Sequence, residues 1–147
     1  MNLKNLLKNL AQKIKALEYS LGLIADYVVE TGTSGIWTYE KWESGKSVCW
    51  GTKSHTVTTW YGWGNLQEGF PAFDSISYPS GLFLSYPCLE FTVDGGANGA
   101  NGAGSCGIEL FKNGSATQTP YCYILRPNAL VASATYYVHI TANGVWK

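Results

Sequence analysis

The sequence has little charge and few of the side chains that usually carry out chemistry. Asp, Glu, Lys and Arg make up 14% of the 147 residues, and the formal net charge is zero. About a quarter of the residues are charged in ordinary soluble proteins. Without a basic excess, nucleic-acid binding is not indicated. There are two histidines and four cysteines, none of them in a CxxC pair, so we expect no zinc site and no other metal or cofactor.

Long apolar runs are also missing. The first 25 residues contain many leucines, but they are interrupted by Lys4, Lys8, Lys13 and Lys15. We therefore expect neither a signal peptide nor a transmembrane helix. A chain made in the cytoplasm keeps its thiols reduced, so we expect the cysteines to act as small apolar residues. They are Cys49, Cys88, Cys106 and Cys122.

Residues 1–28 have the clearest periodicity in the chain. Apolar residues recur at alternating spacings of four and three, and they are Leu3, Leu7, Leu10, Ile14, Leu17, Leu21, Ile24 and Val28. This a/d repeat predicts a coiled-coil oligomerisation helix. The alternative is an amphipathic helix packed on its own domain, but the stripe is narrow, which favours self-association. Mixed Leu and Ile at both positions favours three or four strands over two, and we predict a parallel homotrimer.

After this helix the pattern changes to short β-prone runs between turn residues. We predict a hinge at residues 29–35 and a β-sandwich knob domain at 36–147, jelly-roll-like and antiparallel. The fold class is thus mainly β with an N-terminal helix. The predicted strands are 36–42, 46–51, 54–61, 73–78, 82–85, 88–94, 107–112, 120–126, 135–142 and 144–147.

The stretch GIWTYEKWESGKSVCWG, residues 35–51, predicts a β-hairpin. A two-residue turn at Ser44-Gly45 would place Glu43 opposite Lys46. It would also place Tyr39 opposite Trp50. Opposite charges and facing aromatic rings are both favourable cross-strand pairs, although a one-residue change of register would exchange the faces.

None of the polar residues forms a recognisable catalytic motif, and we predict that the protein is not an enzyme. Glu40 and Glu43 are three residues apart in a strand, so their side chains point to opposite faces and make a poor glycosidase pair. His55 and His139 have no GxSxG or similar motif near them and are expected to be ordinary strand residues. No basic cluster flanks a cysteine as it would flank an activated thiolate.

Two other segments are candidates for contact with a partner. The run TWYGWGN contains Trp60, Tyr61 and Trp63, which can stack on sugar rings or can fill the core or a subunit interface. The Gly-rich segment 95–107 matches neither GxGxxG nor a P-loop. It is expected to be a surface loop, or alternatively a tip loop or a segment packed at a threefold axis.

The hairpin and the end of the chain resemble a known group of domains. The run DYVVETGTSGIWTYEKWESGKSVCWG resembles the start of C-terminal domains of bacteriophage and prophage structural proteins of Gram-positive bacteria, of tail-fibre, baseplate or head-fibre type. These share W-x-Y-x-K-W-x-x-G-x-x-x-C/x-W-G, and TYYVHITANGVWK resembles their closing strand. The resemblance covers residues 26–51 and 135–147. It implies a homotrimer with a coiled-coil stem and a β-sandwich knob that decorates the virion or binds host-surface glycan.

Together, these observations predict a trimeric virion structural protein of fibre or knob type, with other virion proteins and host carbohydrate as partners. We expect neither nucleic-acid binding nor membrane insertion. The stem is short compared with the shafts of long fibres, which leaves a small capsid or tail decoration open. A non-catalytic carbohydrate-binding module is the alternative, and an enzyme such as a depolymerase is the third hypothesis.

Overall fold

In the part of the chain that it describes, the computed structural model contains one helix followed by nine strands. It describes residues 2–20, 22, 26–95, 106–111, 113–127 and 133–147. Helix α1 covers Leu3–Ser20. The strands are β1 (Val28–Ser34), β2 (Trp37–Trp42), β3 (Lys46–Val57), β4 (Thr59–Trp63), β5 (Leu66–Phe73), β6 (Cys88–Gly95), β7 (Gly107–Leu110), β8 (Cys122–Arg126) and β9 (Ala134–Val145). We call residues 26–147 the β domain.

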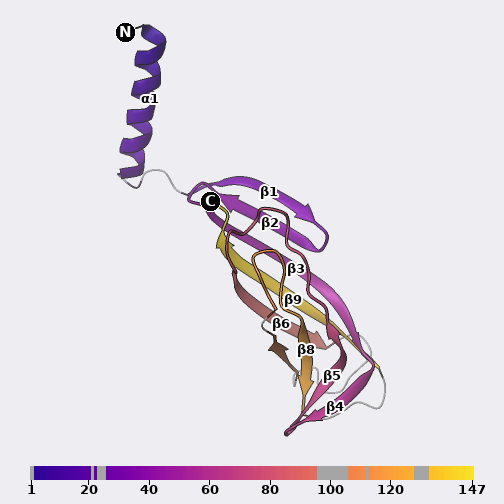
Figure 1. Cartoon of the computed structure of the whole chain (residues 1–147). Helices are drawn as coiled ribbons and strands as arrows, with labels where there is room; N and C mark the ends of the chain where they lie inside the picture. The colour runs from indigo at the N-terminus through magenta and orange to yellow at the C-terminus, as the bar shows by residue number, and fades with distance from the viewer. Residues whose placement is uncertain (1, 21, 23–25, 96–105, 112, 128–132) are drawn as a thin grey trace.

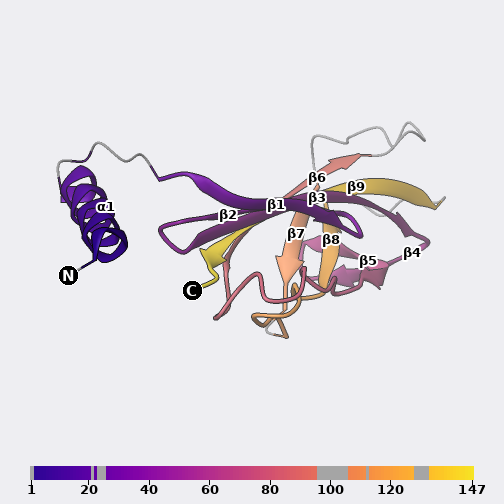
Figure 2. The same cartoon turned by 90° about the horizontal axis from the view of Figure 1, so that it is seen from above.

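The strands form two antiparallel sheets. The larger has five strands in the order β1-β2-β3-β9-β6, and the smaller has four in the order β4-β5-β8-β7. Figure 2 shows the smaller sheet lying beneath one end of the larger sheet. In Figure 1, β4 and β5 lie at the end of the β domain opposite to the C-terminus. The prediction of a mainly β, antiparallel fold with an N-terminal helix is confirmed.

The core lies between the sheets because alternate residues of each strand point to the same face. Its largest fully buried side chains come from both sheets and from the segments between them; they include Trp37, Val57, Phe73, Leu82, Ile124, Tyr136, Val138 and Ile140. Cys49 and Cys122 are buried there too, and burial raises the pKa of each thiol to about 12. Both therefore stay protonated at neutral pH and act as apolar packing groups.

The larger sheet begins with a meander, which the predicted jelly roll does not contain. Strands β1, β2 and β3 are neighbours in sequence and in the sheet. The two connections between them are short and contain Gly35 and Gly45, with φ of 59° and 95°. Only glycine adopts such angles without strain, and connections this short keep consecutive strands side by side.

The predicted boundary between stem and knob was wrong. We predicted a hinge at residues 29–35, but strand β1 occupies most of this segment and pairs with β2. Val28, assigned to the heptad, is the first residue of β1. The Thr, Gly and Ser residues of this segment resemble a turn in composition, yet the ladder of backbone hydrogen bonds to β2 satisfies their backbone groups in extended form.

The β2–β3 hairpin forms with a register one residue away from the predicted one. Tyr39 pairs with Cys49 and Thr38 pairs with Trp50, whereas we predicted Tyr39 opposite Trp50. The connection has three residues, because β2 ends at Trp42 and β3 begins at Lys46. The extra turn residue shifts the pairing by one position and exchanges the faces.

The longer turn also changes the partner of one glutamate. Glu43 forms an ion pair with Lys147 at 3.4 Å instead of pairing with Lys46. The Lys46 ammonium lies 4.8 Å from the centre of the Trp42 ring. Glu40 lies in β2 and Glu43 in the turn, so the structure does not bring the two carboxylates together as a pair on one strand face.

Apart from Phe73 at the end of β5, the predicted strands 73–78 and 82–85 form a partly buried loop between β5 and β6. It covers one end of the inner face of the larger sheet, where Tyr78, Leu82 and Phe83 are buried. The Trp37 indole N–H donates to the Ser77 carbonyl at 2.7 Å. The Ser47 hydroxyl donates to the Leu82 carbonyl at 2.8 Å. The loop is therefore held by side chains of the sheet in place of a strand ladder, and the predicted strand 144–147 is likewise only the end of β9.

Candidate functional site

Two surfaces present apolar side chains to solvent, and the first is helix α1. No side chain of α1 is buried, and the helix stands clear of both sheets (Figure 1). The predicted heptad residues within it are all about half exposed or more; they are Leu3, Leu7, Leu10, Ile14 and Leu17. Leu21 and Ile24 lie outside the described residues. Within the described part of the chain, no helix is long and apolar enough to cross a membrane.

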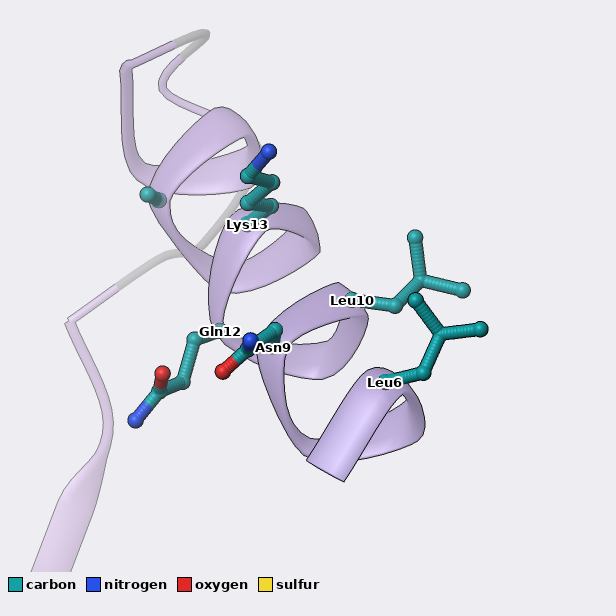
Figure 3. A pocket seen from close by; sticks show the side chains of 6 residues that line it. Leu6, Asn9, Leu10, Gln12 and Lys13 are labelled. Carbon is teal, nitrogen blue, oxygen red and sulfur yellow. The ribbon is translucent and has the colours of Figure 1, made fainter. Parts of the chain in front are cut away.

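A groove runs along one side of α1. It has a volume of about 450 Å³ and is lined by Leu6, Asn9, Leu10, Gln12, Lys13 and Ala16. Figure 3 shows Leu6 and Leu10 pointing to one side, with Asn9 and Gln12 nearer the other. One helix alone cannot enclose a cavity, so the groove is a surface depression between successive side chains. Of its lining residues only Leu10 is at an a or d position of the heptad, so the groove lies beside the apolar seam through which a coiled coil would pack.

The second surface is the outer face of the four-stranded sheet, to which the predicted aromatic cluster contributes. Strand alternation separates its three rings. Trp60 points inward and packs on Tyr136, with ring centroids 6.3 Å apart. Tyr61 and Trp63 point outward and are 57% and 49% exposed. Trp60 is therefore partly buried against the core, and the structure leaves Tyr61 and Trp63 as the accessible members of the predicted glycan contact.

A continuous row of five rings begins at Tyr61. The rings come from β4, β5 and β8, from the segment just after β7 and from the residue just before β8. The Tyr61 and Phe70 centroids are 4.9 Å apart, and those of Phe70 and Tyr123 are 4.7 Å apart. Tyr123 contacts Phe111 at 5.3 Å, and Phe111 stacks on Tyr121 at 4.5 Å with an interplanar angle of 13°. We call these five residues the aromatic face.

Four members of the aromatic face were missed in the sequence. Tyr121 and Tyr123 are two residues apart, so a strand places them on one face, and this spacing was a usable signal. Phe70 lies in β5, for which no strand was predicted before residue 73. Phe111 meets Tyr123 only through the pairing of β7 with β8, and a sequence read segment by segment does not give that pairing.

Two carboxylates lie beside the rings of the aromatic face. Glu68 pairs with Tyr61 across β4 and β5, and Glu109 pairs with Tyr123 across β7 and β8. Partial burial, and then the charge of Glu109, raise the pKa of Glu68. Partial burial followed by the charge of Glu68 raises the pKa of Tyr123. Neither carboxylate has an ion-pair partner among the residues that the structure describes.

A hollow lies at the end of the row formed by Phe111 and Tyr121. It has a volume of about 620 Å³ and is also lined by Leu110 and Asn113. The Asn113 side-chain oxygen accepts a hydrogen bond from the Tyr121 N–H at 3.0 Å. Its amide nitrogen donates to the Ser75 hydroxyl at 3.4 Å. These bonds fix the polar wall of the hollow beside the stacked rings.

The outer face of the five-stranded sheet carries the other noteworthy polar group. His139 Nε2 is 2.9 Å from the Asp94 carboxylate, and its Nδ1 is 2.8 Å from the Thr52 hydroxyl. A hydroxyl, an imidazole and a carboxylate in line occur in nucleophilic triads. Here they lie on the open face formed by β3, β9 and β6, where the backbone N–H groups of the central strand β9 are used in the ladders to both neighbours. His139 is thus a hydrogen-bonded sheet residue, as predicted.

The other residues considered in the sequence form no second candidate site within the described ranges. Three or more His, Cys, Asp or Glu side chains do not come together anywhere in the described ranges. His55 faces the smaller sheet, where its Nε2 is 2.9 Å from the Pro71 carbonyl oxygen. Most of the Gly-rich segment 95–107 lies outside the described residues, so the predictions made for it stay predictions.

Two solved structures resemble this chain. An N-truncated R1-type pyocin tail fibre has a TM-score of 0.54 and 14% sequence identity, over 88% of this chain and 94% of that one. The fold thus resembles that of a pyocin tail fibre. A C-terminal fragment of the R1 pyocin fibre of P. aeruginosa has a TM-score of 0.50 and 12% identity, over 82% of this chain and 28% of that one. No protein-family model and no curated protein matches the sequence.

The tail-fibre fold supports the coarser part of the resemblance found in the sequence. Both structural neighbours are pyocin fibres by their descriptions, which agrees with a tail-fibre-like domain. The neighbour whose organism is given comes from P. aeruginosa, so the link to Gram-positive bacteria stays a prediction. At such low identity the likeness concerns the fold, and no residue of the aromatic face is assigned by it.

Proposed function

We propose that this chain is a structural component of a phage or phage-like tail, in which α1 joins three copies and the β domain forms a knob that contacts host-surface glycan. The observation that carries the proposal is the tail-fibre fold, shared over most of both chains. The half-exposed heptad of α1 supports the trimer, because five apolar side chains on one stripe favour a partner helix. No catalytic residue is part of the proposal, and the chain acts in the virion.

Three joined knobs would bind a surface more strongly than one. When the first knob is bound, the others are held near the same surface at a high effective concentration, so weak single sites give strong overall attachment. This role fits an accessible aromatic face better than a deep pocket. The trimer is therefore the part of the proposal to test first.

The test measures the mass of the full chain in solution by light scattering at micromolar concentration. We expect three times the chain mass for the wild type and a smaller mass for Leu10→Asp with Leu17→Asp, because both substitutions put carboxylates into the apolar seam. The matched control is Asn9→Asp with Gln12→Asp, which adds the same charge to α1 outside the a and d positions. A monomeric wild type, or a seam variant with the same mass as the control, contradicts trimerisation through α1.

A non-catalytic carbohydrate-binding module is the second candidate, and the exposed Tyr61 and Trp63 rings favour it. The two functions differ in assembly. A module of this kind binds saccharide as a monomer, whereas the proposed tail component binds as a trimer that disperses when the seam of α1 is charged. Measuring mass and saccharide binding on the same samples separates them.

A further inference from the structure

The aromatic face has the size and composition of a binding surface for an extended ligand. Its rings run across strands that are about 4.8 Å apart, so a row crossing four strands is about 15 Å long. A single small ring covers only part of this length. The rings from Tyr61 to Tyr121 follow one another at centroid distances between 4.5 and 5.3 Å, so the surface is continuous.

These rings are not required by the core. Inward positions of the same strands fill it: Ile124 in β8 is fully buried, and Gly69 in β5 packs under Val57 and Trp60. The aromatic face is the alternate set of positions and is partly exposed, with Tyr61 at 57%. Tyr and Trp rings stack on sugar rings and keep a polar group at the edge.

Charge distinguishes between the possible occupants. Glu68 and Glu109 place two carboxylates beside Tyr61 and Tyr123. Partial burial, and then the charge of Glu109, raise the pKa of Glu68. Carboxylates accept hydrogen bonds from hydroxyl and ammonium groups, so sugars with free hydroxyls or amines suit this face. A polyanionic glycan would bring like charge to it.

A second copy of this chain suits the aromatic face less well. If the β domain of that copy faced Glu68 and Glu109, it would need a basic patch, and the described cations of the β domain are already engaged. Lys41 forms an ion pair with Glu30, and Lys147 forms one with Glu43. Lys46 and Lys53 lie over the rings of Trp42 and Phe73. Arg126 is buried and donates a hydrogen bond to the Tyr136 hydroxyl.

We propose that the outer face of the four-stranded sheet binds a saccharide chain of neutral or amino-bearing sugars. The chain lies across β4, β5, β8 and the segment after β7. Its sugar rings stack on Tyr61, Phe70 and Tyr123, and its hydroxyl or amino groups donate to Glu68 and Glu109. Its end reaches the hollow beside Phe111 and Tyr121. This inference rests on the proposed attachment to a host surface and gives the site and the chemical class of the ligand.

The experiment titrates the full chain with three sets of oligosaccharides by calorimetry: cello-oligosaccharides as neutral chains, chitosan oligomers as amino-bearing chains and oligogalacturonates as anionic chains. We expect binding to the neutral or amino-bearing set and weaker binding to the anionic set. Tyr61→Ala and Tyr123→Ala should each weaken binding about tenfold. Tyr137→Ala is the matched control, because Tyr137 is an exposed tyrosine on the outer face of the other sheet and its loss should leave the affinity unchanged.

Several results would overturn the inference. One is failure of the wild type to bind any neutral or amino-bearing set, and another is a stronger affinity for the anionic set. A third is an equal loss in Tyr137→Ala and Tyr61→Ala. If Tyr123→Ala does not fold, Tyr61→Ala decides, because Tyr61 lies on an edge strand and is the more exposed. Light scattering of the same variants distinguishes the two proposals. A trimer that binds none of the saccharides refutes only this site. Dissociation caused by Tyr61→Ala would instead identify the aromatic face as a subunit contact.

Discussion

The two sheets share one core but have different outer faces. On the five-stranded sheet, outward side chains bond to one another, as in the Thr52–His139–Asp94 row and the Thr56–Thr135 pair. On the four-stranded sheet, outward side chains form a row of aromatic rings with two carboxylates that lack a described ion-pair partner. The first face satisfies its polar groups within the sheet. The second leaves apolar surface and hydrogen-bond acceptors available to another molecule.

The comparison shows that strand alternation predicts which residues form the core more readily than it predicts what the outer faces do. Both sheets turn their apolar positions inward, as any sandwich must. What distinguishes them is the residue type at the outward positions, which folding leaves largely free. Large aromatic side chains at such positions carry a cost in exposed apolar area. The four-stranded sheet gathers five of them in one row, whereas the outer face of the five-stranded sheet exposes Trp50 and Tyr137.

The largest expected effect separates the inner from the outer side of β8. Ile124 is fully buried between the sheets, and its neighbour Leu125 points to the outer face. Ile124→Ala should lower the free energy of unfolding by about 2–5 kcal/mol. Leu125→Ala should lower it by less than about 1 kcal/mol, because no core cavity forms. Denaturant titration of both variants checks this, and equal losses would mean that the outer face also contributes to folding.

A smaller effect distinguishes two glycines, one in each sheet. A Cβ added at Gly51 in β3 would meet the Ile36 backbone carbonyl oxygen, whereas one added at Gly107 in β7 would meet no atom within 4 Å. Gly51→Ala should therefore destabilise the protein by about 1–3 kcal/mol. Gly107→Ala should be neutral or stabilising by about 0.5 kcal/mol, because alanine loses less backbone entropy on folding. Thermal unfolding measures both, and a large loss at Gly107 would show that the edge of the smaller sheet is packed more closely than the structure has it.

Much of the fold could be predicted where local pattern decides it. The alternation of apolar and polar residues gave the positions of β2, β8 and β9, and the heptad gave α1. Strand β1 was missed because its Thr, Gly and Ser residues resemble a turn, and pairing with β2 overrides that preference. The loop between β5 and β6 was read as strands because its aromatic residues are β-prone. In the structure, Tyr78 and Phe83 of this loop are buried under the end of the larger sheet, which local sequence does not reveal.

The candidate site could be predicted only in part for a similar reason. Tyr61 and Trp63 were found because they are near each other in sequence. Phe70 and Tyr123 join them only through the pairing of β5 with β4 and β8. Glu68 was also overlooked, since a lone glutamate in a strand gives no signal until Glu109 is placed near it. Sites built across strands depend on register, and a one-residue error in register changes the face, as the β2–β3 hairpin showed.

The smallest expected effect compares one carboxylate from each outer face. Asp94 accepts a hydrogen bond from His139, whereas Glu68 lies near Glu109 and its pKa is raised by partial burial and by that charge. Because the pKa of Glu68 is raised in the folded protein, ionised Glu68 lowers the stability of the fold, whereas protonated Glu68 does not. Glu68→Gln should therefore stabilise the protein at pH 7, by less than about 1 kcal/mol. The gain should disappear below the unfolded-state value of 4.5, where the carboxyl group is neutral in both states.

Asp94→Asn should have the opposite sign at pH 7, because it removes the negative charge from the acceptor of the His139 N–H on the other face, and hydrogen bonds to an ionised acceptor are stronger than those to a neutral one. Denaturant titrations of the wild type and both variants at pH 7 and at pH 4 measure the four differences. A gain at Glu68→Gln that persists unchanged at pH 4 would mean that shape rather than charge causes it. A loss at pH 7 would mean that Glu68 is already paired with a cation. In that case the charge argument for neutral or amino-bearing sugars fails, while the stacking surface stays intact.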